Sequence, residues 1–235
     1  MEDQFERTRL LIGDTALQKI QHSKIVVFGV GGVGSYVVEA LARAGIGHIV
    51  LVDPDTVDIT NLNRQIEALH STIGKLKVEV VKKRILDINP EAEVEIYKPN
   101  DIAGGEFNLI DKSFTYVVDA IDTMKNKIQI IEKAYKENVK IISATGAANK
   151  IQPSLFEVSD IYNTSVCPVC KILRKELKQR NIPSLKVVYS KEVPKKIKKE
   201  EKKLGSISFV PSVEGLIMAG EVIKDIIKEV SYGKV

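Results

Sequence analysis

A short polar string carries most of the side chains in this sequence that could do chemistry. It reads DPDTVDITNLNRQ and follows an apolar run at residues 48–52. Its carboxylates, amides and guanidinium are those of Asp53, Asp55, Asn61, Asn63, Arg64 and Gln65. Cationic and amide donors can offset the charge that develops when an α-phosphate is attacked and pyrophosphate departs. Hydride transfer makes no use of them, so the string favours nucleotidyl transfer over a dehydrogenase reaction.

Two further charged residues complete the candidate set. Lys77 lies 13 residues beyond Arg64, near the start of an expected helix that could return it to the same cleft. Asp122, with Thr123 beside it, follows the apolar run TYVVDA, and a carboxylate at the end of such a strand could hold Mg²⁺ on a triphosphate. Each residue also has a plainer interpretation: Asp55 and Asn61 could fix a turn, and Arg64 and Lys77 could be solvated surface charges.

The sequence GVGGVG at residues 29–34 matches the pattern G-x-G-x-x-G between an expected strand and an expected helix. Its glycines are Gly29, Gly31, Gly32 and Gly34. They allow a tight turn, close approach of the backbone to phosphate, and close packing of the helix on the strand. The helix N-terminus then presents free N–H groups to an anion. Asp53 lies where such folds place a ribose-binding carboxylate, so an NAD-binding oxidoreductase or a nucleotide sensor remains an alternative.

The elements that must position these residues alternate between strand and helix. We expect strands at residues 24–30, 48–52, 92–97, 116–120 and 140–144, and helices at 35–44, 72–89 and 125–138. Strand–helix–strand units of this length require parallel pairing with right-handed crossovers. The strands are apolar throughout, as in a sheet that is covered on both faces. The pattern predicts an α/β fold: a doubly wound, Rossmann-like, mostly parallel sheet with helices on both faces.

Beyond residue 150 the pattern is weaker. We expect a basic helix at 167–180, a short strand at 186–189, a lysine-rich loop at 191–203 and a closing helix at 212–228. The residues of that helix expected to pack in the core are Leu216, Ile217, Ala219, Gly220, Ile223 and Ile226. Residues 1–235 are expected to form a single domain, with a nucleotide-binding core at 1–150 and a substrate-side half at 151–235.

The composition is that of an ordinary globular protein, with 44% hydrophobic and 28% charged residues. It excludes a disordered chain, a collagen and a disulfide-stapled secreted module. The most apolar stretch is interrupted by glycines, Glu39 and Arg43, so we expect no membrane insertion. The polar first residues do not resemble a signal peptide, and two cysteines suit a reducing compartment, so we expect a cytoplasmic protein.

The net charge of +4 conceals an uneven distribution. Residues 171–203 contain 13 Lys and Arg against 4 Asp and Glu, so the rest of the chain carries a net charge of −5. A basic segment on an acidic body could bind a phosphate backbone, or it could be a solvated lysine-rich loop. The segment contains Tyr189 as its sole aromatic residue, so base stacking from this stretch is not supported.

The two cysteines, Cys167 and Cys170, form a single C-x-x-C pair. A structural zinc site usually needs four ligands, often two such pairs, and the chain has no third cysteine. A redox pair is a second alternative, because a helix N-terminus can lower a thiol pKa. We interpret the pair as incidental thiols.

Taken together, the motifs resemble the ubiquitin-activating-enzyme-like (ThiF/MoeB/HesA) adenylyltransferases. They are GVGGVG, DPDTVDITNLNRQ, GKLK at residues 74–77, and VVDAIDT. The resemblance implies ATP as co-substrate, with its ribose bound by Asp53. It implies phosphate contacts from Asn61, Asn63, Arg64 and Lys77, and Mg²⁺ binding by Asp122. It also implies a homodimer in which Arg7 reaches the partner's site, although the nearby Arg9 could take that role.

Three longer stretches resemble one branch of this group, the tRNA threonylcarbamoyladenosine dehydratases. They are ALARAGIGHIVLVDPDTVDITNLNRQIEALHSTIGKLKVEV, SATGAANKIQPSLFEVSDI and SFVPSVEGLIMAGEVI. The branch implies an ATP-dependent ligase-type enzyme that adenylates the threonylcarbamoyl carboxylate of a tRNA nucleoside beside the anticodon. The carbamoyl group of that nucleoside then closes a ring, and AMP leaves. The basic segment 171–203 would bind the anticodon arm, and a sulfur-relay protein is a possible further partner.

The main alternative within the same group is an enzyme that adenylates the C-terminus of a sulfur-carrier or ubiquitin-like protein. A thioester-forming role for Cys167 would belong to that reaction. In the tRNA reaction the substrate supplies its own nucleophile, so no activated cysteine is needed. Both enzymes share the short motifs, so the choice between them depends on the three longer stretches.

Overall fold

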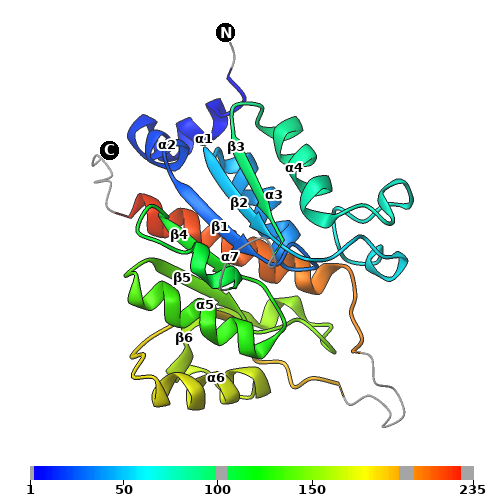
Figure 1. Cartoon of the computed structure of the whole chain (residues 1–235), viewed down its shortest axis with the longest axis vertical. Coiled ribbons are helices and arrows are strands. Elements are labelled where there is room, and N and C mark those ends of the chain that lie inside the picture. The colour runs from blue at the N-terminus through cyan, green and yellow to red at the C-terminus, as the bar shows by residue number, and fades with distance from the viewer. Residues whose placement is uncertain (1–2, 99–104, 196–203, 229–235) are drawn as a thin grey trace.

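Seven strands form one sheet in the order β3-β2-β1-β4-β5-β7-β6 (Figure 1). The computed structural model describes residues 3–98, 105–195 and 204–228. The strands are β1 (Lys24–Phe28), β2 (His48–Val52), β3 (Glu93–Tyr97), β4 (Tyr116–Asp119), β5 (Lys140–Ala144), β6 (Phe156–Asp160) and β7 (Lys186–Ser190). All neighbouring strands are parallel except the β6–β7 pair at one edge, which is antiparallel.

Helices cover both faces of this sheet. The helices α3 (Gly34–Ala44), α4 (Lys77–Ile88) and α7 (Phe209–Ile227) pack on one face, and α5 (Met124–Lys136) and α6 (Pro168–Gln179) pack on the other. Side chains of β1 alternate between the two layers: Ile25 and Val27 face the first, and Val26 and Phe28 face the second. A strand buried on both faces is apolar at every position, which explains its continuous hydrophobic pattern. The predicted doubly wound α/β fold is confirmed.

The order of the strands places a switch point between β1 and β4. From β1 the chain moves to β2 and β3 on one side, and it then crosses to β4 on the other side. The loops that leave the carboxyl ends of β1 and β4 therefore diverge, and open α/β sheets bind ligands in the crevice between such loops. The glycine loop follows β1, and the run that contains Asp122 follows β4.

Two N-terminal helices, α1 (Glu6–Ile12) and α2 (Asp14–Gln21), were not expected from the sequence. Helix α2 buries Ala16, Leu17 and Ile20, whereas α1 buries no residue. The Phe5 ring lies against Gly45, which precedes β2, so both helices lie at the amino ends of the strands. The described part of the chain contains no helix that is long and apolar enough to cross a membrane.

Several boundaries differ from the predictions. Helix α4 begins at Lys77 rather than at residue 72, because Gly74 adopts the left-handed conformation (φ 82°) and interrupts the chain after a short 3-10 turn. Helix α7 begins three residues earlier than predicted, at Phe209. Strand β6 was missed, since an edge strand with one solvent-facing side gives only a weak pattern. The predicted loop 191–203 lies mostly outside the described residues; residues 191–195 form no helix or strand.

The core prediction for α7 is wrong at two positions, and one of them is Gly220, which lines an open groove. Leu216 was expected to pack inside, but its side chain is 49% exposed on α7. The core-facing side of this helix is formed by other residues, among them Val210, Met218 and Val222. Periodicity predicted the helix but misplaced part of its buried face.

The close contact between α3 and the glycine loop can be tested by a pair of Gly→Ala variants. A Cβ on Gly34 would lie 1.8 Å from the carbonyl oxygen of Gly29, so Gly34→Ala should lower the free energy of unfolding by about 3 kcal/mol or prevent folding. A Cβ on Gly220 in α7 would have no atom within 4 Å, so Gly220→Ala should stabilise by up to about 1 kcal/mol. Urea unfolding followed by circular dichroism measures both, and equal stability of the two variants would contradict the packing described.

Candidate active site

The glycine loop is built around close backbone contacts. Gly29 adopts a positive φ of 85°, and a Cβ there would lie 2.9 Å from the carbonyl oxygen of Ala120. Asp53 fixes the loop from the side: its Oδ2 accepts the N–H of Val30 and its Oδ1 accepts that of Asp55, each at 2.8 Å. Burial raises the pKa of Asp53, against the effect of these bonds and of Lys77. The end of β2 and the glycine loop are thereby joined through one carboxylate.

The string that follows β2 folds back over this loop. Its 3-10 turn, Ile59–Asn61, is capped by Asp58, and in return Asn61 Oδ1 accepts the N–H of Asp58 at 3.0 Å. The contacts of Asn61 are therefore those of a residue that fixes a turn. Arg64 Nη1 donates to Thr60 O and Asn63 Oδ1, each at 2.8 Å. The Arg64 stem lies 3.5 Å from the Cβ position of Gly32, so its guanidinium lies beside the glycine loop.

Gln65 also contacts the loop. Its Nε2 lies 3.4 Å from the Cβ position of Gly31, while its Oε1 is buried without a hydrogen-bond partner among the described residues. A Cβ at Gly31 would therefore touch Gln65 at ordinary van der Waals distance. The unpartnered oxygen leaves this amide able to accept a further hydrogen bond.

Lys77 is a buried cation among three carboxylates. Its Nζ lies 2.8 Å from Asp55 Oδ2, and the Lys77 side chain is 6% exposed, so the alternative of a solvated surface charge is wrong for this residue. Its charge also acts on Asp53 and on Glu67. The Asp55 carboxylate is 62% exposed, so water or a ligand can compete for Lys77 from the open side. The Lys77–Asp55 pair is therefore accessible to an anion from the side of Asp55.

Glu67 was missed by sequence reasoning. Its side chain is 1% exposed, and neither carboxylate oxygen finds a hydrogen-bond partner among the described residues. Burial raises the pKa of Glu67 to about 7. No motif marks such a residue, because a buried acid and a surface acid look alike in a sequence.

The end of β4 carries two acids with different environments. Asp119 is fully buried and pairs with Lys127 Nζ at 2.8 Å, and Lys127 also donates to Ala144 O at 3.0 Å. Burial raises the pKa of Asp119 despite this partner. Asp122 and Thr123 are exposed, and the Thr123 hydroxyl lies 3.4 Å from Asp122 Oδ1. Asp119 thus acts as a structural counter-ion, whereas the oxygens of Asp122 are open to a cation.

A second missed acid supports the loop after β5. Glu214 of α7 is fully buried, and its Oε1 accepts the N–H groups of Thr145 (3.1 Å) and Gly146 (3.2 Å). Burial raises the pKa of Glu214 to about 7. The next residue, Gly215, packs on the carbonyl of Val33 in the glycine loop, where a Cβ would lie 2.4 Å from the oxygen. Helix α7 therefore links the nucleotide loop to the loop at 145–150.

The cysteine pair lies in the core beneath α6. Cys167 is the N-cap residue of that helix, and its Sγ accepts the N–H of Cys170 at 3.4 Å. A hydrogen bond from the Cys170 thiol lowers the pKa of Cys167 to about 5, and the same contact raises that of Cys170. Within the described ranges no further His, Asp or Glu joins the pair in a group that could hold a metal ion.

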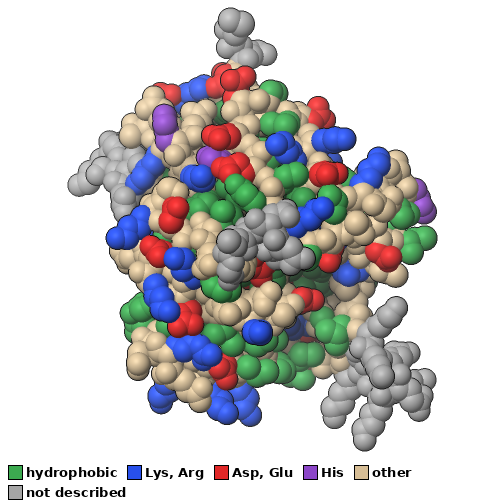
Figure 2. Space-filling model, viewed as in Figure 1, with side chains coloured by type: hydrophobic (Ala, Val, Ile, Leu, Met, Phe, Trp, Pro, Cys, Tyr) green, Lys and Arg blue, Asp and Glu red, His purple; other side chains and the backbone are tan. Residues whose placement is uncertain are grey.

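The basic segment is only partly free to bind a partner. Lys186 lies between Glu221 (3.3 Å) and Asp225 (2.7 Å), and Arg174 donates to Thr164 O at 3.0 Å. The lysines of α6 at positions 171, 175 and 178 are exposed. Figure 2 shows Lys and Arg side chains gathered over the lower edge of the molecule, where α6 lies. Residues 196–203 lie outside the described residues.

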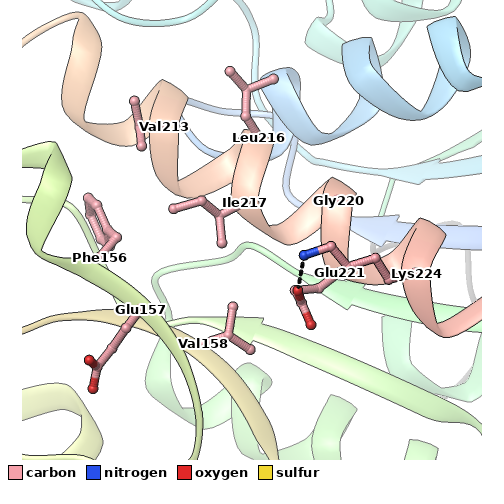
Figure 3. Close-up of a pocket in the computed structure, with 9 residues that line it drawn as sticks. All are labelled: Phe156, Glu157, Val158, Val213, Leu216, Ile217, Gly220, Glu221 and Lys224. Atoms are coloured by element: carbon pink, nitrogen blue, oxygen red, sulfur yellow. Dashed lines mark hydrogen bonds and ion pairs between the residues drawn. The ribbon is translucent and has the colours of Figure 1, made fainter. Parts of the chain in front are cut away.

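An open apolar groove of about 440 Å³ runs between α7 and the edge strand β6 (Figure 3). It is lined by Phe156, Val158, Val213, Leu216, Ile217 and Gly220, with Glu157, Glu221 and Lys224 at its rim. A second apolar surface lies on α1, where Leu10 and Leu11 are 81% and 82% exposed.

Arg7 on the same helix is exposed at the amino ends of the strands, so it does not reach the glycine loop of its own chain.

Comparisons with known proteins agree on one family. The model of the ThiF family matches residues 5–234. The chain is 41% identical to the tRNA threonylcarbamoyladenosine dehydratase of Bacillus subtilis, over 100% of this chain and 99% of that protein. The structure is similar to that of the Escherichia coli enzyme in complex with AMP, with a TM-score of 0.87, 31% identity, and coverage of 98% and 96% of the two chains. A complex of the same enzyme with ATP matches with a TM-score of 0.86 and 31% identity, over 98% and 96% of the two chains.

The raised pKa of Glu67 predicts a specific pH dependence of stability. The pKa of this group is about 7 in the folded chain against an ordinary value of 4.5, so the unfolded chain loses the proton first. The contribution of Glu67 is therefore present below pH ~4.5 and is lost as the pH rises through about 7. Glu67→Gln should be more stable than the wild type at pH 8 by up to roughly 3 kcal/mol, and this gain should shrink toward pH 5.

Urea unfolding at pH 5 and pH 8 measures this difference. Glu79→Gln, which changes an exposed glutamate on α4, is the matched control and should shift stability equally at both pH values. A pH-independent effect of Glu67→Gln would contradict the burial of a carboxyl group at this position.

Proposed function

Because the chain belongs to the ThiF family, we propose that it is an ATP-dependent enzyme that dehydrates N6-threonylcarbamoyladenosine beside the tRNA anticodon to a cyclic form. The observation that carries this proposal is the full-length similarity to the Bacillus subtilis dehydratase, at 41% identity. The chemistry of the crevice agrees with it, because a glycine loop, an arginine and a buried lysine meet at the carboxyl edge of the sheet. We propose the cytoplasm as the compartment of this tRNA-modifying enzyme.

We propose that ATP binds across the switch point. The N-terminus of α3 and the glycine loop would face the phosphates, since free N–H groups and the helix dipole favour anions there. The side chains proposed to contact the nucleotide are Asp53, Asp55, Asn61, Asn63, Arg64, Gln65, Lys77, Asp122 and Thr123. Supporting observations are the position of the Arg64 stem against Gly32 and the open side of the Lys77–Asp55 pair. On ATP binding, Lys77 would exchange Asp55 for a phosphate oxygen.

A magnesium ion is proposed to accompany the triphosphate, held by Asp122. Carboxylate oxygen is the ligand that Mg²⁺ prefers, and this carboxylate is exposed beside the crevice. When bound, the ion would offset charge on the phosphates. Asp119 is not proposed as a ligand, because Lys127 already occupies its buried carboxylate.

The reaction needs two displacements. An oxygen of the threonyl carboxylate attacks the α-phosphorus of ATP, the bond to pyrophosphate breaks, and a mixed acyl–AMP anhydride forms. The carbamoyl group of the same nucleoside then attacks the acyl carbon and loses a proton, and AMP leaves with the former carboxylate oxygen. Arg64 and Lys77 are proposed to stabilise negative charge on the α-phosphate and on the departing pyrophosphate. Ring closure within one substituent has a high effective molarity, so the protein needs no nucleophile of its own.

The burial of Cys167 argues against the sulfur-carrier alternative. A thioester-forming cysteine must reach the adenylated end of a protein substrate, but Cys167 is 4% exposed and its sulfur caps α6. Its lowered pKa is explained by the neighbouring thiol and by this capping contact. We propose a sulfur-relay protein as a further partner, which would bind through a surface outside this core.

We propose that the anticodon arm binds along the basic segment 171–203. The exposed lysines of α6 support this, as does the charge of the whole segment, since phosphate contacts supply most non-specific affinity for nucleic acids. Lys186 and Arg174 are excluded from this role, because their charged groups are engaged within the protein.

We further propose a homodimer in which Arg7 reaches the partner's crevice. Helix α1 exposes two leucines, and the groove beside α7 exposes Leu216, so both surfaces lack a cover within the described chain. The start of α7 lies beside Gly32, at the carboxyl ends of the strands. Helix α7 also contacts α2, which lies at the amino ends of the strands. A two-fold axis that paired α7 with its copy in antiparallel orientation would bring the partner's α1 toward the glycine loop.

The reaction itself is tested by mass spectrometry of tRNA nucleosides after incubation with enzyme and ATP. The threonylcarbamoyl nucleoside should lose one water, and Arg64→Ala, Lys77→Ala and Asp122→Ala should each lower kcat by about 100-fold or more. Lys75→Ala, which removes an exposed lysine two positions from Lys77, should retain activity. An unchanged nucleoside with folded wild-type protein would refute the proposed function.

The role of Arg7 in a partner's site is tested by mixing two inactive variants. Arg7→Ala and Asp122→Ala should each be inactive alone, but mixed dimers would contain one site with both residues intact. Mixing after mild dissociation should restore about a quarter of wild-type activity. If Arg7 acts within its own chain, or if the enzyme is a monomer, mixing will restore no activity. An active Arg7→Ala variant would instead assign the role in the partner's site to Arg9.

A further inference from the structure

The cysteine pair is a feature of the molecule that the proposed reaction does not use. Cys167 and Cys170 are the two cysteines of the chain, and both are free thiols. Cys167 caps the N-terminus of α6, and Cys170 lies in the first turn of the same helix. The Sγ of Cys167 accepts the backbone N–H of Cys170 at 3.4 Å, and the Cys170 thiol donates to the same sulfur. The two sulfur atoms therefore lie next to each other in one helical turn.

The backbone just before the pair is strained. Val166 has a φ of 60°, in the left-handed region, where a β-branched residue is an outlier. The N–H of Cys167 donates to Ser165 O at 2.5 Å, which closes a three-residue turn around Val166. Pro168, whose fixed φ suits the first helical position, then starts α6. This strained turn directs the Cys167 sulfur to the helix N-terminus, beside the second thiol.

The two sulfur atoms differ in their protonation. The hydrogen bond from the Cys170 thiol lowers the pKa of Cys167, and the charge of Lys150 acts in the same direction. The same hydrogen bond, together with burial, raises the pKa of Cys170. At neutral pH a thiolate therefore lies beside a thiol, and the thiolate is the nucleophilic form of cysteine.

The exposure of the pair selects the reagents that can reach it. Cys167 is 4% exposed, which excludes the carboxyl end of a protein substrate, as argued above. The residues around it in sequence, Ser165, Val166 and Pro168, are exposed, so its sulfur lies just below the surface. Hydrogen peroxide is little larger than a water molecule and needs contact with a single sulfur atom. A small oxidant of this kind fits the site.

We propose that Cys167 and Cys170 are a redox site that hydrogen peroxide converts to a reversible intrachain disulfide. Both sulfur atoms are packed in the apolar cluster beneath α6 rather than in the nucleotide crevice, so the site is separate from the tRNA reaction. In a reducing compartment, disulfides of this kind are transient and form in response to an oxidant.

The oxidation proceeds in two steps. The Cys167 thiolate attacks one oxygen of the peroxide, the O–O bond breaks, and hydroxide leaves and takes up a proton, so that Cys167 becomes a sulfenic acid. The negative charge that raises the pKa of Cys170 is then gone. The Cys170 sulfur attacks the Cys167 sulfur, its proton leaves with the hydroxyl group as water, and the S–S bond forms. Two thiols are thereby oxidised by two electrons, and one peroxide is reduced to two waters.

The test counts free thiols in the full-length protein before and after treatment with hydrogen peroxide at neutral pH. The protein is then unfolded in N-ethylmaleimide, and its intact mass is measured. Reduced wild type should take up two labels. Treated wild type should take up none and should weigh less than the reduced, unlabelled chain by two hydrogen atoms, and dithiothreitol should restore both labels.

Two serine variants identify the role of each sulfur. Cys170→Ser keeps the nucleophile and a hydrogen-bond donor beside it, so it should stop at a sulfenic acid that dimedone traps. Cys167→Ser keeps only the thiol with the raised pKa, so it should lose its label at least about 10-fold more slowly than Cys170→Ser. Equal rates in the two variants would overturn the assignment of Cys167 as the nucleophile.

The wild-type result decides the proposal without reliance on either variant. Two labels after peroxide treatment would overturn it, because the thiols would then be inert. Disulfide-linked dimers on a non-reducing gel, or a gain of oxygen that dithiothreitol does not reverse, would also overturn it, because Cys170 would then not intercept the sulfenic acid.

Discussion

The close approach of backbone to backbone around the glycine loop is the constraint on which the rest of the structure depends. Helix α3 starts against the carbonyl of Gly29, and helix α7 crosses the loop at Gly215, where a Cβ would lie 2.4 Å from Val33 O. Both contacts require glycine. They bring two helices to the carboxyl edge of the sheet, and α7 then carries Glu214 to the loop after β5. The nucleotide crevice and the substrate-side half are therefore held by one helix.

Around this frame, charge is distributed between buried and open groups. Asp119, Lys127 and Glu214 are buried and fix strand ends and loops, whereas Asp122 is exposed to the crevice. Lys77 lies between these extremes, because its ammonium group is buried while its partner Asp55 faces water. A site of this kind keeps its cationic groups in place by internal counter-ions and can exchange one of those counter-ions for a phosphate.

Much of the fold could be predicted from the sequence, because strands buried on both faces and glycines between strand and helix leave strong local patterns. The string after β2 also has a local pattern, and the structure brings Arg64 beside the glycine loop. Glu67, Glu214 and the Asp119–Lys127 pair could not be predicted, since their burial depends on contacts between segments far apart in the chain. Leu216 was misassigned for a related reason: an apolar stripe on a helix does not reveal whether the protein's own core covers it.

Adenylation of the threonyl carboxylate by ATP is the step on which the proposed function depends. It is tested most directly by labelling that carboxylate with ¹⁸O in the tRNA nucleoside and analysing the AMP that is released. Adenylation predicts one ¹⁸O atom in the phosphate of AMP for each nucleoside dehydrated, because the carboxylate oxygen that attacks the α-phosphorus leaves with AMP. Unlabelled AMP, or ADP as the product of turnover, would contradict it.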